Sequence, residues 1–111
     1  MKKLKIATEF SRIPGARYEH EGAFPGKDFR DKHLFPKISE AIKLGEKLEI
    51  DLDGTAGLGT SFLEESFGGL IRINKLNYDD IIRTLIYIST EEPDYIDEIN
   101  AYLKDADENE K

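Results

Sequence analysis

The chain has 111 residues, with 16 Lys plus Arg, 23 Asp plus Glu and a formal net charge of −7. This length suits one domain, and no apolar run is long enough to form a membrane-spanning helix. Without cysteine, the protein has no disulfides, thiolate metal sites or thiol catalysis. Residues 51–111 hold five basic and 15 acidic side chains, a balance that disfavours nucleic-acid binding by this half. No apolar stretch follows the basic start, so we expect no signal peptide and a cytoplasmic protein.

The first half of the chain predicts a strand, a turn-rich stretch and a helix. Residues 2–8 alternate loosely and predict an opening strand, and residues 17–20, between glycine and proline turns, predict a short second strand. From residue 28 the apolar spacing becomes helical and continues to Leu44. Pro36 is expected either to kink this helix or to open its second half, and Gly45 to end it.

The middle of the chain predicts a strand, a glycine-rich loop and a second helix. Residues 47–52 alternate strictly between apolar and charged side chains, which indicates a strand. The loop at 54–61 leads into a helix that ends at residue 72, for which Thr60 or Ser61 is the expected N-cap. Gly68 and Gly69 cost this helix about 1 kcal/mol each relative to alanine. We therefore expect a close approach there to a neighbouring strand or to a partner.

The last third predicts a short helix capped by Asn77, a strand at 85–88 and a final helix capped by Ser89 or Thr90, with Pro93 in its first turn. Residues 1–106 are expected to form one domain, and 107–111 a disordered acidic tail. Strands that alternate with helices indicate an α/β architecture.

One short motif indicates catalysis. The segment Asp51-Leu-Asp-Gly-Thr55 resembles the nucleophile motif of haloacid-dehalogenase-like phosphatases, in which the first Asp attacks phosphorus, the second is the general acid and both lie near Mg²⁺. That family carries the motif on its opening strand, with a larger sheet after it than the residues here can supply. The competing interpretation is structural: Asp51, Asp53 and Gly54 end the strand and stabilise the turn.

Other signals of chemistry are weaker. The glycine-rich loop lacks the Gly-Lys-Ser/Thr of a P-loop, and His20 and His33 do not have metal-ligand spacing. The sequence therefore predicts no catalytic residue, cofactor or metal. The hydroxyl pair Thr60-Ser61 at a helix start suits a phosphate, which the free amides of the first turn stabilise. The alternative interpretation is that one of these residues is only the helix cap.

A longer resemblance covers residues 10–75. The segment 50–72, which contains Ser-Phe-Leu-Glu-Glu-Ser-Phe-Gly-Gly-Leu, resembles the core of the STAS-like domain family of unknown function. Upstream, Pro14-Gly-Ala-Arg-Tyr18, Gly26-Lys-Asp-Phe-Arg30 and Leu34-Phe-Pro36 fit the same family in the same order. The resemblance implies an α/β, STAS-like single domain: a small mixed β-sheet packed against helices, with the strand at 47–52 central.

The resemblance also implies a function. The related STAS domains of anti-sigma-factor antagonists have an Asp-Ser-Ser-Gly loop whose first Ser is phosphorylated by an ATP-binding anti-sigma kinase. On this chain Thr60 takes the phosphorylated place, Ser61 the next, and Gly59 replaces the Asp. The implied protein is a bacterial, non-catalytic regulatory module that binds a protein partner, and the implied partner is an ATP-binding, histidine-kinase-like protein. The alternatives are a structural subunit of a larger complex and the Mg²⁺-dependent phosphatase.

The expected site residues follow from this implied function. Thr60 and Ser61 form the centre for phosphorylation or partner contact. The further partner contacts are Gly57, Gly59, Phe62, Glu64, Glu65 and Arg72, and the structural residues are Asp51, Asp53, Gly54, Gly68 and Gly69. Arg72 is expected to pair with Glu64 or Glu65, or with the partner.

Overall fold

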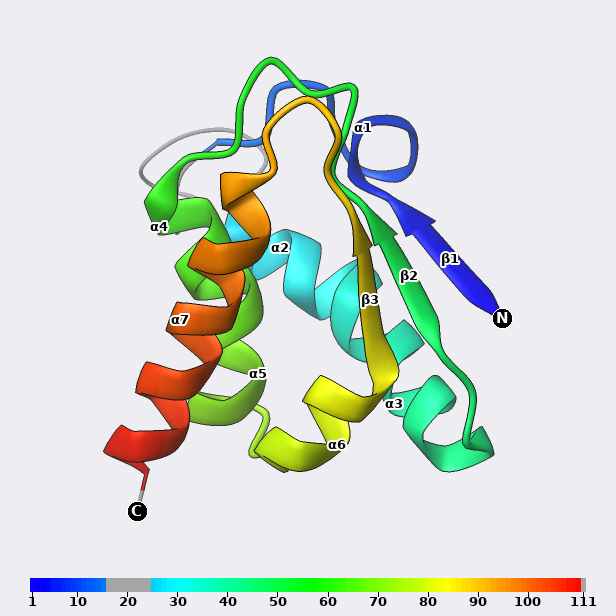
Figure 1. The fold of residues 1–111 in the computed structure, drawn as a ribbon, viewed down its shortest axis with the longest axis vertical. Coiled ribbons are helices and arrows are strands. Elements are labelled where there is room, and N and C mark those ends of the chain that lie inside the picture. The colour runs from blue at the N-terminus through cyan, green and yellow to red at the C-terminus, as the bar shows by residue number, and fades with distance from the viewer. Residues whose placement is uncertain (16–24, 111) are drawn as a thin grey trace.

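The computed structural model describes residues 1–15 and 25–110, and a sheet of three strands lies at its centre (Figure 1). The strands are β1 (Lys2–Lys5), β2 (Leu48–Asp51) and β3 (Leu85–Ile88), and β2 lies between the other two. Both neighbouring pairs are parallel. The described strands thus form a parallel sheet with the expected central strand, and not the mixed sheet that was predicted. Helical segments between consecutive strands return the chain to the same end of the sheet, and this forces parallel pairing.

Two long helical runs contribute most of the helices that pack on the sheet. Helical run 26–44 consists of α2 (Gly26–Phe29), the π-helical η2 (Arg30–Leu34) and α3 (Phe35–Leu44). Helical run 60–72 consists of α4 (Thr60–Leu63), the π-helical η3 (Glu64–Gly68) and α5 (Gly69–Arg72). The shorter α1 (Ile6–Glu9) and α6 (Tyr78–Thr84) and the long α7 (Asp94–Asn109) complete the fold.

Several helix ends lie where the sequence predicts them. Pro36 stands in the first turn of α3 inside a continuous helical run, so it opens the second half of the helix. Gly45 ends α3 in the left-handed conformation, at φ 69°, which glycine adopts without steric cost. Asn77 caps α6, because its side-chain oxygen accepts a hydrogen bond from the amide of Asp80 at 3.1 Å.

The sheet buries one of its two faces. Leu4, Leu48 and Ile50 point toward the helices and are completely buried. The alternate residues Lys3 and Ile86 on the opposite face are exposed. Parallel sheets usually have both faces covered, so a face that is left exposed at Lys3 and Ile86 by the described residues is a distinguishing feature of the fold.

The N-terminal segment differs from its prediction. The opening strand ends at Lys5, and Ile6–Glu9 turn into α1. The carboxylate of Glu9 accepts a hydrogen bond from the amide of Lys5 at 2.8 Å, which fixes this turn. The strand predicted at 17–20, and His20 with it, lie outside the described residues.

The C-terminal helix also differs from its prediction. Pro93 is its N-cap, whereas the Ser89 hydroxyl donates to the carbonyl of Glu92. The helix continues to Asn109, so residues 107–109 of the expected disordered tail are helical. An ion pair between Lys75 and Glu110, at 3.2 Å, holds its end against the loop between α5 and α6. Among the helices of residues 1–15 and 25–110, none combines the length and apolar character required to cross a bilayer.

Candidate functional site

The candidate site lies at the carboxyl end of the sheet, where the loop after β2 meets helical run 60–72. Thr60 and Ser61 are both exposed there. Gly59, with φ −71° and ψ 159°, is the N-cap and supplies no side chain to the helix. The prediction that Thr60 or Ser61 caps this helix is therefore wrong by one residue. Both hydroxyls belong to the first turn, whose amides have no intrahelical acceptors.

Asp53 joins this loop to the loop between β3 and α7. Its carboxylate accepts hydrogen bonds from the amide of Thr90 at 3.2 Å, from the Thr90 hydroxyl and from the amide of Glu91 at 3.0 Å. In return, the Glu91 carboxylate accepts from the amide of Gly54 at 2.7 Å. The Tyr95 hydroxyl accepts from the amide of Leu58 at 3.0 Å. We call this set of contacts the Asp53 latch. It joins the loop after β2 to the loop after β3 and to the start of α7, so that they form one continuous surface.

The hydrogen bonds that the Asp53 carboxylate accepts in the Asp53 latch are expected to weaken in acid. Hydrogen bonds from the Glu91 amide and the Thr90 hydroxyl lower the pKa of Asp53 below its ordinary value of 3.8. Because the pKa is lowered on folding, these hydrogen bonds stabilise the fold fully at pH values above the ordinary pKa of 3.8. Their contribution is lost as the pH falls through the folded-state pKa. In an NMR titration down to about pH 2, the amide signals of Thr90 and Glu91 should move together with a midpoint below 3.8. In Asp53→Ala they should already occupy the shifted positions at neutral pH. A midpoint above 3.8 would contradict this account.

The contacts of Asp51 are those of a residue that ends a strand and stabilises the turn after it, as the structural interpretation of the sequence predicts. One of its carboxylate oxygens accepts from the amide of Asp53 at 3.0 Å, and the other pairs with the Lys5 ammonium at 3.3 Å. Gly54 continues the turn at φ 91°, a left-handed conformation that favours glycine. Both carboxylates of the Asp-x-Asp motif thus bind groups of the chain itself, which supports the turn-forming role of Asp51, Asp53 and Gly54.

Within the described residues, no group of three His, Cys, Asp or Glu side chains could hold a metal ion. His33 packs between aromatic rings, with its ring centre 5.5 Å from that of Phe10 and 6.1 Å from that of Phe29. The structure therefore gives His33 a packing role.

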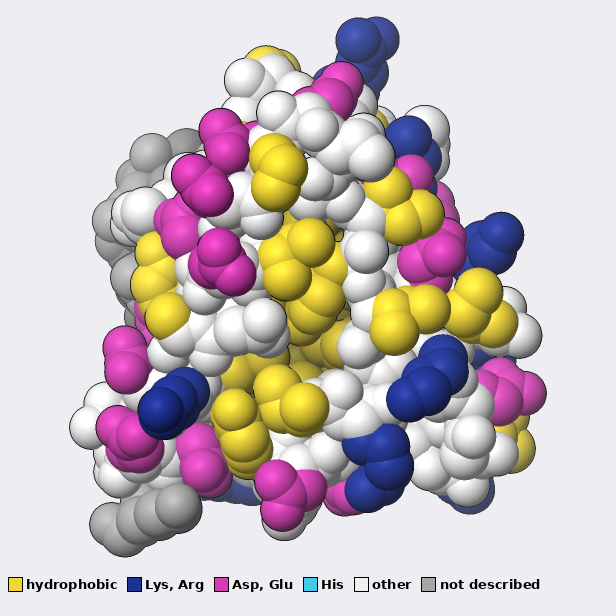
Figure 2. All heavy atoms as spheres, in the orientation of Figure 1, with side chains coloured by type: hydrophobic (Ala, Val, Ile, Leu, Met, Phe, Trp, Pro, Cys, Tyr) yellow, Lys and Arg dark blue, Asp and Glu magenta, His cyan; other side chains and the backbone are white. Residues whose placement is uncertain are grey.

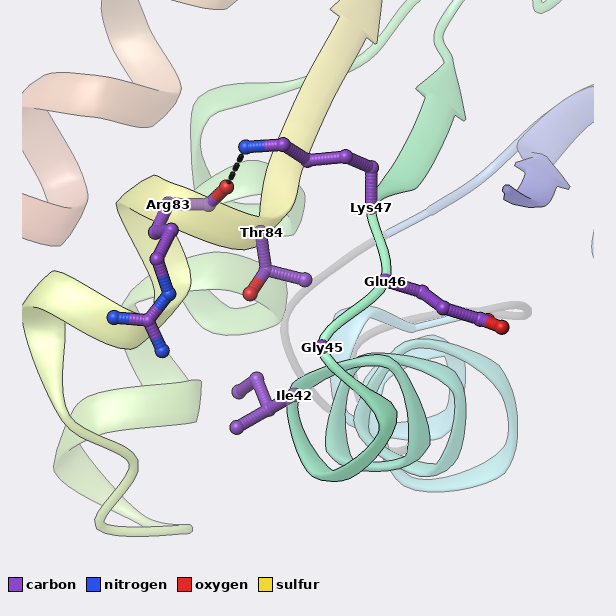
Figure 3. A pocket seen from close by; sticks show the side chains of 6 residues that line it. All are labelled: Ile42, Gly45, Glu46, Lys47, Arg83 and Thr84. Carbon is purple, nitrogen blue, oxygen red and sulfur yellow. Dashed lines mark hydrogen bonds between the residues drawn. The ribbon is translucent and has the colours of Figure 1, made fainter.

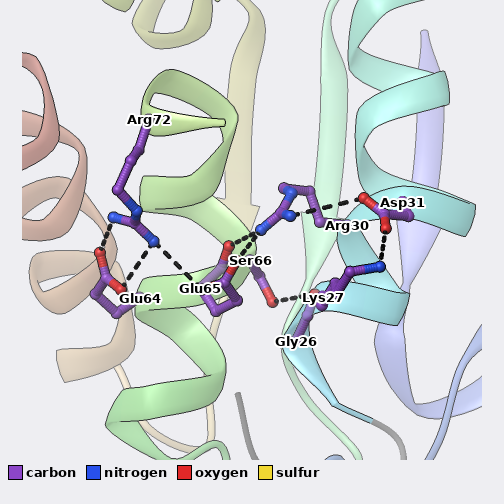
Figure 4. A network of polar contacts seen from close by, with 8 residues as sticks. All are labelled: Gly26, Lys27, Arg30, Asp31, Glu64, Glu65, Ser66 and Arg72. Carbon is purple, nitrogen blue, oxygen red and sulfur yellow. Dashed lines mark hydrogen bonds and ion pairs between the residues drawn. The ribbon is translucent and has the colours of Figure 1, made fainter. Parts of the chain in front are cut away.

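A buried charge network lies behind the loop–helix junction (Figure 4). The Arg30 guanidinium donates to the side chain and, at 2.6 Å, to the carbonyl of Glu65, and both side chains are 2% exposed. Arg72 donates to both oxygens of Glu64, at 2.6 and 3.2 Å, and to the second oxygen of Glu65 at 3.3 Å. The predicted pairing of Arg72 with its glutamate neighbours is thus confirmed.

Two residues expected to contact a partner lie inside the protein. Phe62 is completely buried in the core, and Glu65 is held by Arg30. Both were expected at the surface because they follow the loop in the partner site that the family resemblance implies, but the helix turns these two positions toward helical run 26–44. Gly57 and Gly59 are exposed, and Glu64 and Arg72 are half-buried, so these four lie at the edge of the site.

Gly68 and Gly69 are explained by contacts inside the chain. A Cβ atom on Gly69 would lie 2.1 Å from a terminal nitrogen of Arg30, and one on Gly68 would lie 2.6 Å from a carboxylate oxygen of Glu64. The expected close approach therefore exists, but it is to the charge network and not to a strand or partner. Sequence reasoning missed Arg30, although a glycine pair within a helix signals that something large packs against it.

A small cavity of about 220 Å³ lies at the opposite end of the sheet (Figure 3). Its lining residues are Ile42, Gly45, Glu46, Lys47, Arg83 and Thr84. The Lys47 ammonium donates to the carbonyl of Arg83 near the end of α6, which satisfies a helix-terminal acceptor. None of the predicted site residues lies there.

Comparison with protein families decides the relationship of this chain. The model of the family described as a STAS-like domain of unknown function matches residues 25–95, well over half of the chain. The chain belongs to this STAS-like family. Searches among curated proteins and among solved structures found no match. The matched segment of this STAS-like domain includes helical run 26–44, β2, helical run 60–72 and β3, and so contains both the Asp53 latch and the charge network.

Proposed function

We propose that this STAS-like domain is a non-catalytic regulatory module that binds a protein partner through the loop at 54–61 and the start of helical run 60–72. An ATP-binding, histidine-kinase-like partner phosphorylates Thr60, or Ser61 beside it, and thereby switches the interaction. The observation that carries this proposal is the pair of exposed hydroxyls in a helical first turn whose cap is Gly59. Because neither hydroxyl caps the helix, a phosphate on Thr60 or Ser61 would leave the helix start intact.

The electrostatics of the junction support a switch. A phosphate on Thr60 is favoured by the free amides of the first turn. It would stand four residues before Glu64, where like charges on one helix face repel. No Lys or Arg lies between Lys47 and Arg72 in the sequence, and Arg72 is already paired with Glu64. On the partner surface, the added charge would favour basic side chains and repel acidic ones.

A second function is favoured by the Asp53 latch. The latch holds the two loops together without any modification, which suits a surface that binds its partner permanently. The protein would then be a structural subunit of a larger complex that is indifferent to ATP.

Phosphate mapping with a matched control separates the two functions. The tagged protein is isolated from its own cells with and without ATP and Mg²⁺, and phosphate is located by mass spectrometry. The proposal expects nucleotide-dependent association and phosphate at Thr60 or Ser61, both lost in the Thr60→Ala, Ser61→Ala double variant and kept in Thr55→Ala. Association that does not depend on nucleotide and is kept in both variants would establish the subunit function. Mg²⁺-dependent hydrolysis of a phosphate ester that disappears in Asp51→Asn would overturn both.

A further inference from the structure

The segment that follows α1 lies against the candidate site. The amide of Ala56, in the middle of the glycine-rich loop, donates to the carbonyl of Arg12 at 2.7 Å. Two residues earlier, the ring centre of Phe10 lies 6.1 Å from that of Phe62, near the start of helical run 60–72. Figure 1 shows this segment and the loop running close together at one end of the molecule. These contacts hold the backbone of Arg12 between the loop and the helix start.

Arg12 brings a positive charge to a loop that has none of its own. The glycine-rich loop and the helical turns that follow it contain no Lys or Arg before Arg72. The Lys5 side chain also approaches the loop, but its ammonium is bound to the carboxylate of Asp51 at 3.3 Å. The Arg12 side chain is exposed, and among the described residues no carboxylate pairs with it. A guanidinium that the fold does not use suits a phosphate, which it binds through two parallel hydrogen bonds.

The backbone on both sides of Arg12 is ordered. The hydroxyl of Ser11, a residue that is 9% exposed, accepts from the amide of Ile13 at 3.0 Å and closes a turn around Arg12. The carbonyl of Arg12 is bound to the loop. The side chain is therefore the movable part of a fixed residue, and on binding a ligand it loses only its own rotamer freedom.

Helix geometry distinguishes the two exposed hydroxyls, because residues four apart share a helix face. Ser61 lies on the face of Glu65, which points toward helical run 26–44 (Figure 4). Thr60 lies on the face of Glu64, which points away from that run and toward Arg72. A phosphate on one hydroxyl would thus have different neighbours from a phosphate on the other.

The N-terminal segment lies on the side of Ser61. The ring of Phe10 contacts Phe62 and also Phe29 of helical run 26–44, with ring centres 5.4 Å apart in the second pair. On the side of Glu64 lies α7, which packs against η3, and Figure 2 shows acidic side chains gathered over its start. A phosphate on Ser61 would therefore face the cation and not the acidic side chains.

From these contacts we infer that the Arg12 guanidinium binds a phosphate carried by the side-chain oxygen of Ser61. The inference rests on the proposed phosphorylation of this site, and it specifies which hydroxyl is modified and which residue of the domain recognises the phosphate. The new ion pair would hold the segment after α1 against the helix start. Phosphorylation would then change the shape of the partner surface together with its charge.

An encoded phosphate tests this contact without a kinase. Phosphoserine is incorporated genetically at position 61 of the full chain, and phosphorus NMR follows its second ionisation, which ordinarily lies near about pH 6. An adjacent cation favours the doubly charged form. The midpoint in the otherwise unchanged chain should therefore lie roughly half a pH unit below that in Arg12→Gln, as for an exposed ion pair. Arg12→Lys should keep part of this difference, because a charge remains but not the planar fork.

Two controls separate a specific contact from the general field of the protein. Arg83→Gln removes an exposed arginine at the opposite end of the sheet and should leave the midpoint unchanged. Phosphothreonine encoded at position 60 should titrate at the same midpoint with and without Arg12. Circular dichroism melting checks that each variant is folded. Equal midpoints with and without Arg12 in the chain phosphorylated at Ser61 overturn the inference, as does an equal shift in either control.

The result is independent of the phosphate mapping that tests the proposed function. Because the phosphate is introduced during synthesis, the contact with Arg12 is measured whether or not a kinase-like partner exists. Lack of phosphate at both hydroxyls in the cell would overturn the proposed function, whereas an unshifted midpoint would overturn only the role of Arg12.

Discussion

Gly69→Ala is expected to lower the free energy of unfolding by roughly 3 kcal/mol, the opposite of what this substitution does in an uncrowded helix. The added methyl group would lie 2.1 Å from a terminal nitrogen of Arg30, 2.9 Å from its central guanidinium carbon and 3.1 Å from its Cδ. Arg30 cannot move aside freely, because it is 2% exposed and bound to Glu65. The methyl group must therefore displace either the helix or the buried ion pair. Without this clash, alanine would instead favour the helix by about 1 kcal/mol.

Urea unfolding measures this effect, with Gly59→Ala as the matched control. Gly59 is the N-cap of the same helical run, and a Cβ atom there meets nothing within 4 Å. The control should change the free energy of unfolding by less than about 1 kcal/mol. If Gly69→Ala is as stable as the control, the close packing of Arg30 on Gly69 is wrong.

Arg30→Met is expected to cost about 3–5 kcal/mol, because it leaves the buried Glu65 carboxylate without its principal partner. Glu65 is 2% exposed, so water cannot easily replace the lost hydrogen bonds, and the contact of Arg72 with its other oxygen is long, at 3.3 Å. This loss is large against the 5–15 kcal/mol that typically separates folded from unfolded domains. Chemical denaturation should show a lower midpoint for this variant.

A thermodynamic cycle tests whether the cost comes from the unpaired charge. Removing both charges, in Arg30→Met with Glu65→Leu, should recover part of the loss, because no uncompensated ion then remains in the core. The exposed pair of Lys27 and Asp31, at 2.9 Å, gives the control: Lys27→Met should cost less than about 1 kcal/mol. Strictly additive effects of the two core substitutions would show that Arg30 and Glu65 are not coupled.

The order of elements was predictable from the sequence because its signals are local. Strict alternation over 47–52 predicted the central strand, and β2 occupies Leu48–Asp51. Gly45 and Asn77 end and begin helices as predicted, since a helix end depends on the conformation or side chain of one residue. The family resemblance of residues 50–72 was likewise readable, and the family match confirms it.

The candidate site was only partly predictable. Thr60 and Ser61 are exposed at a helix start, as the glycine-rich loop before them suggests. The true cap, Gly59, differs by one residue, because glycine can begin a helix without a side-chain hydrogen bond. Phe62 and Glu65 were assigned to the surface, and the structure buries both. The apolar spacing of this helix already places Phe62 on its buried side, whereas the burial of Glu65 depends on Arg30 in the helical run opposite, which periodicity within one helix does not reveal.

The sequence by itself thus determined the order of the strands and long helices from residue 26 onward, the central position of β2, the capping of α6 and the pairing of Arg72 with its own helix. Only the tertiary structure decided that the described strands are all parallel, that Arg30 occupies the space left by Gly69, and that Asp53 fastens a second loop. The physical reason is separation along the chain. Arg30 and Glu65 are 35 residues apart, and Asp53 and Thr90 are 37 apart. Contacts between such distant segments exist only once the packed sheet and helices bring them together.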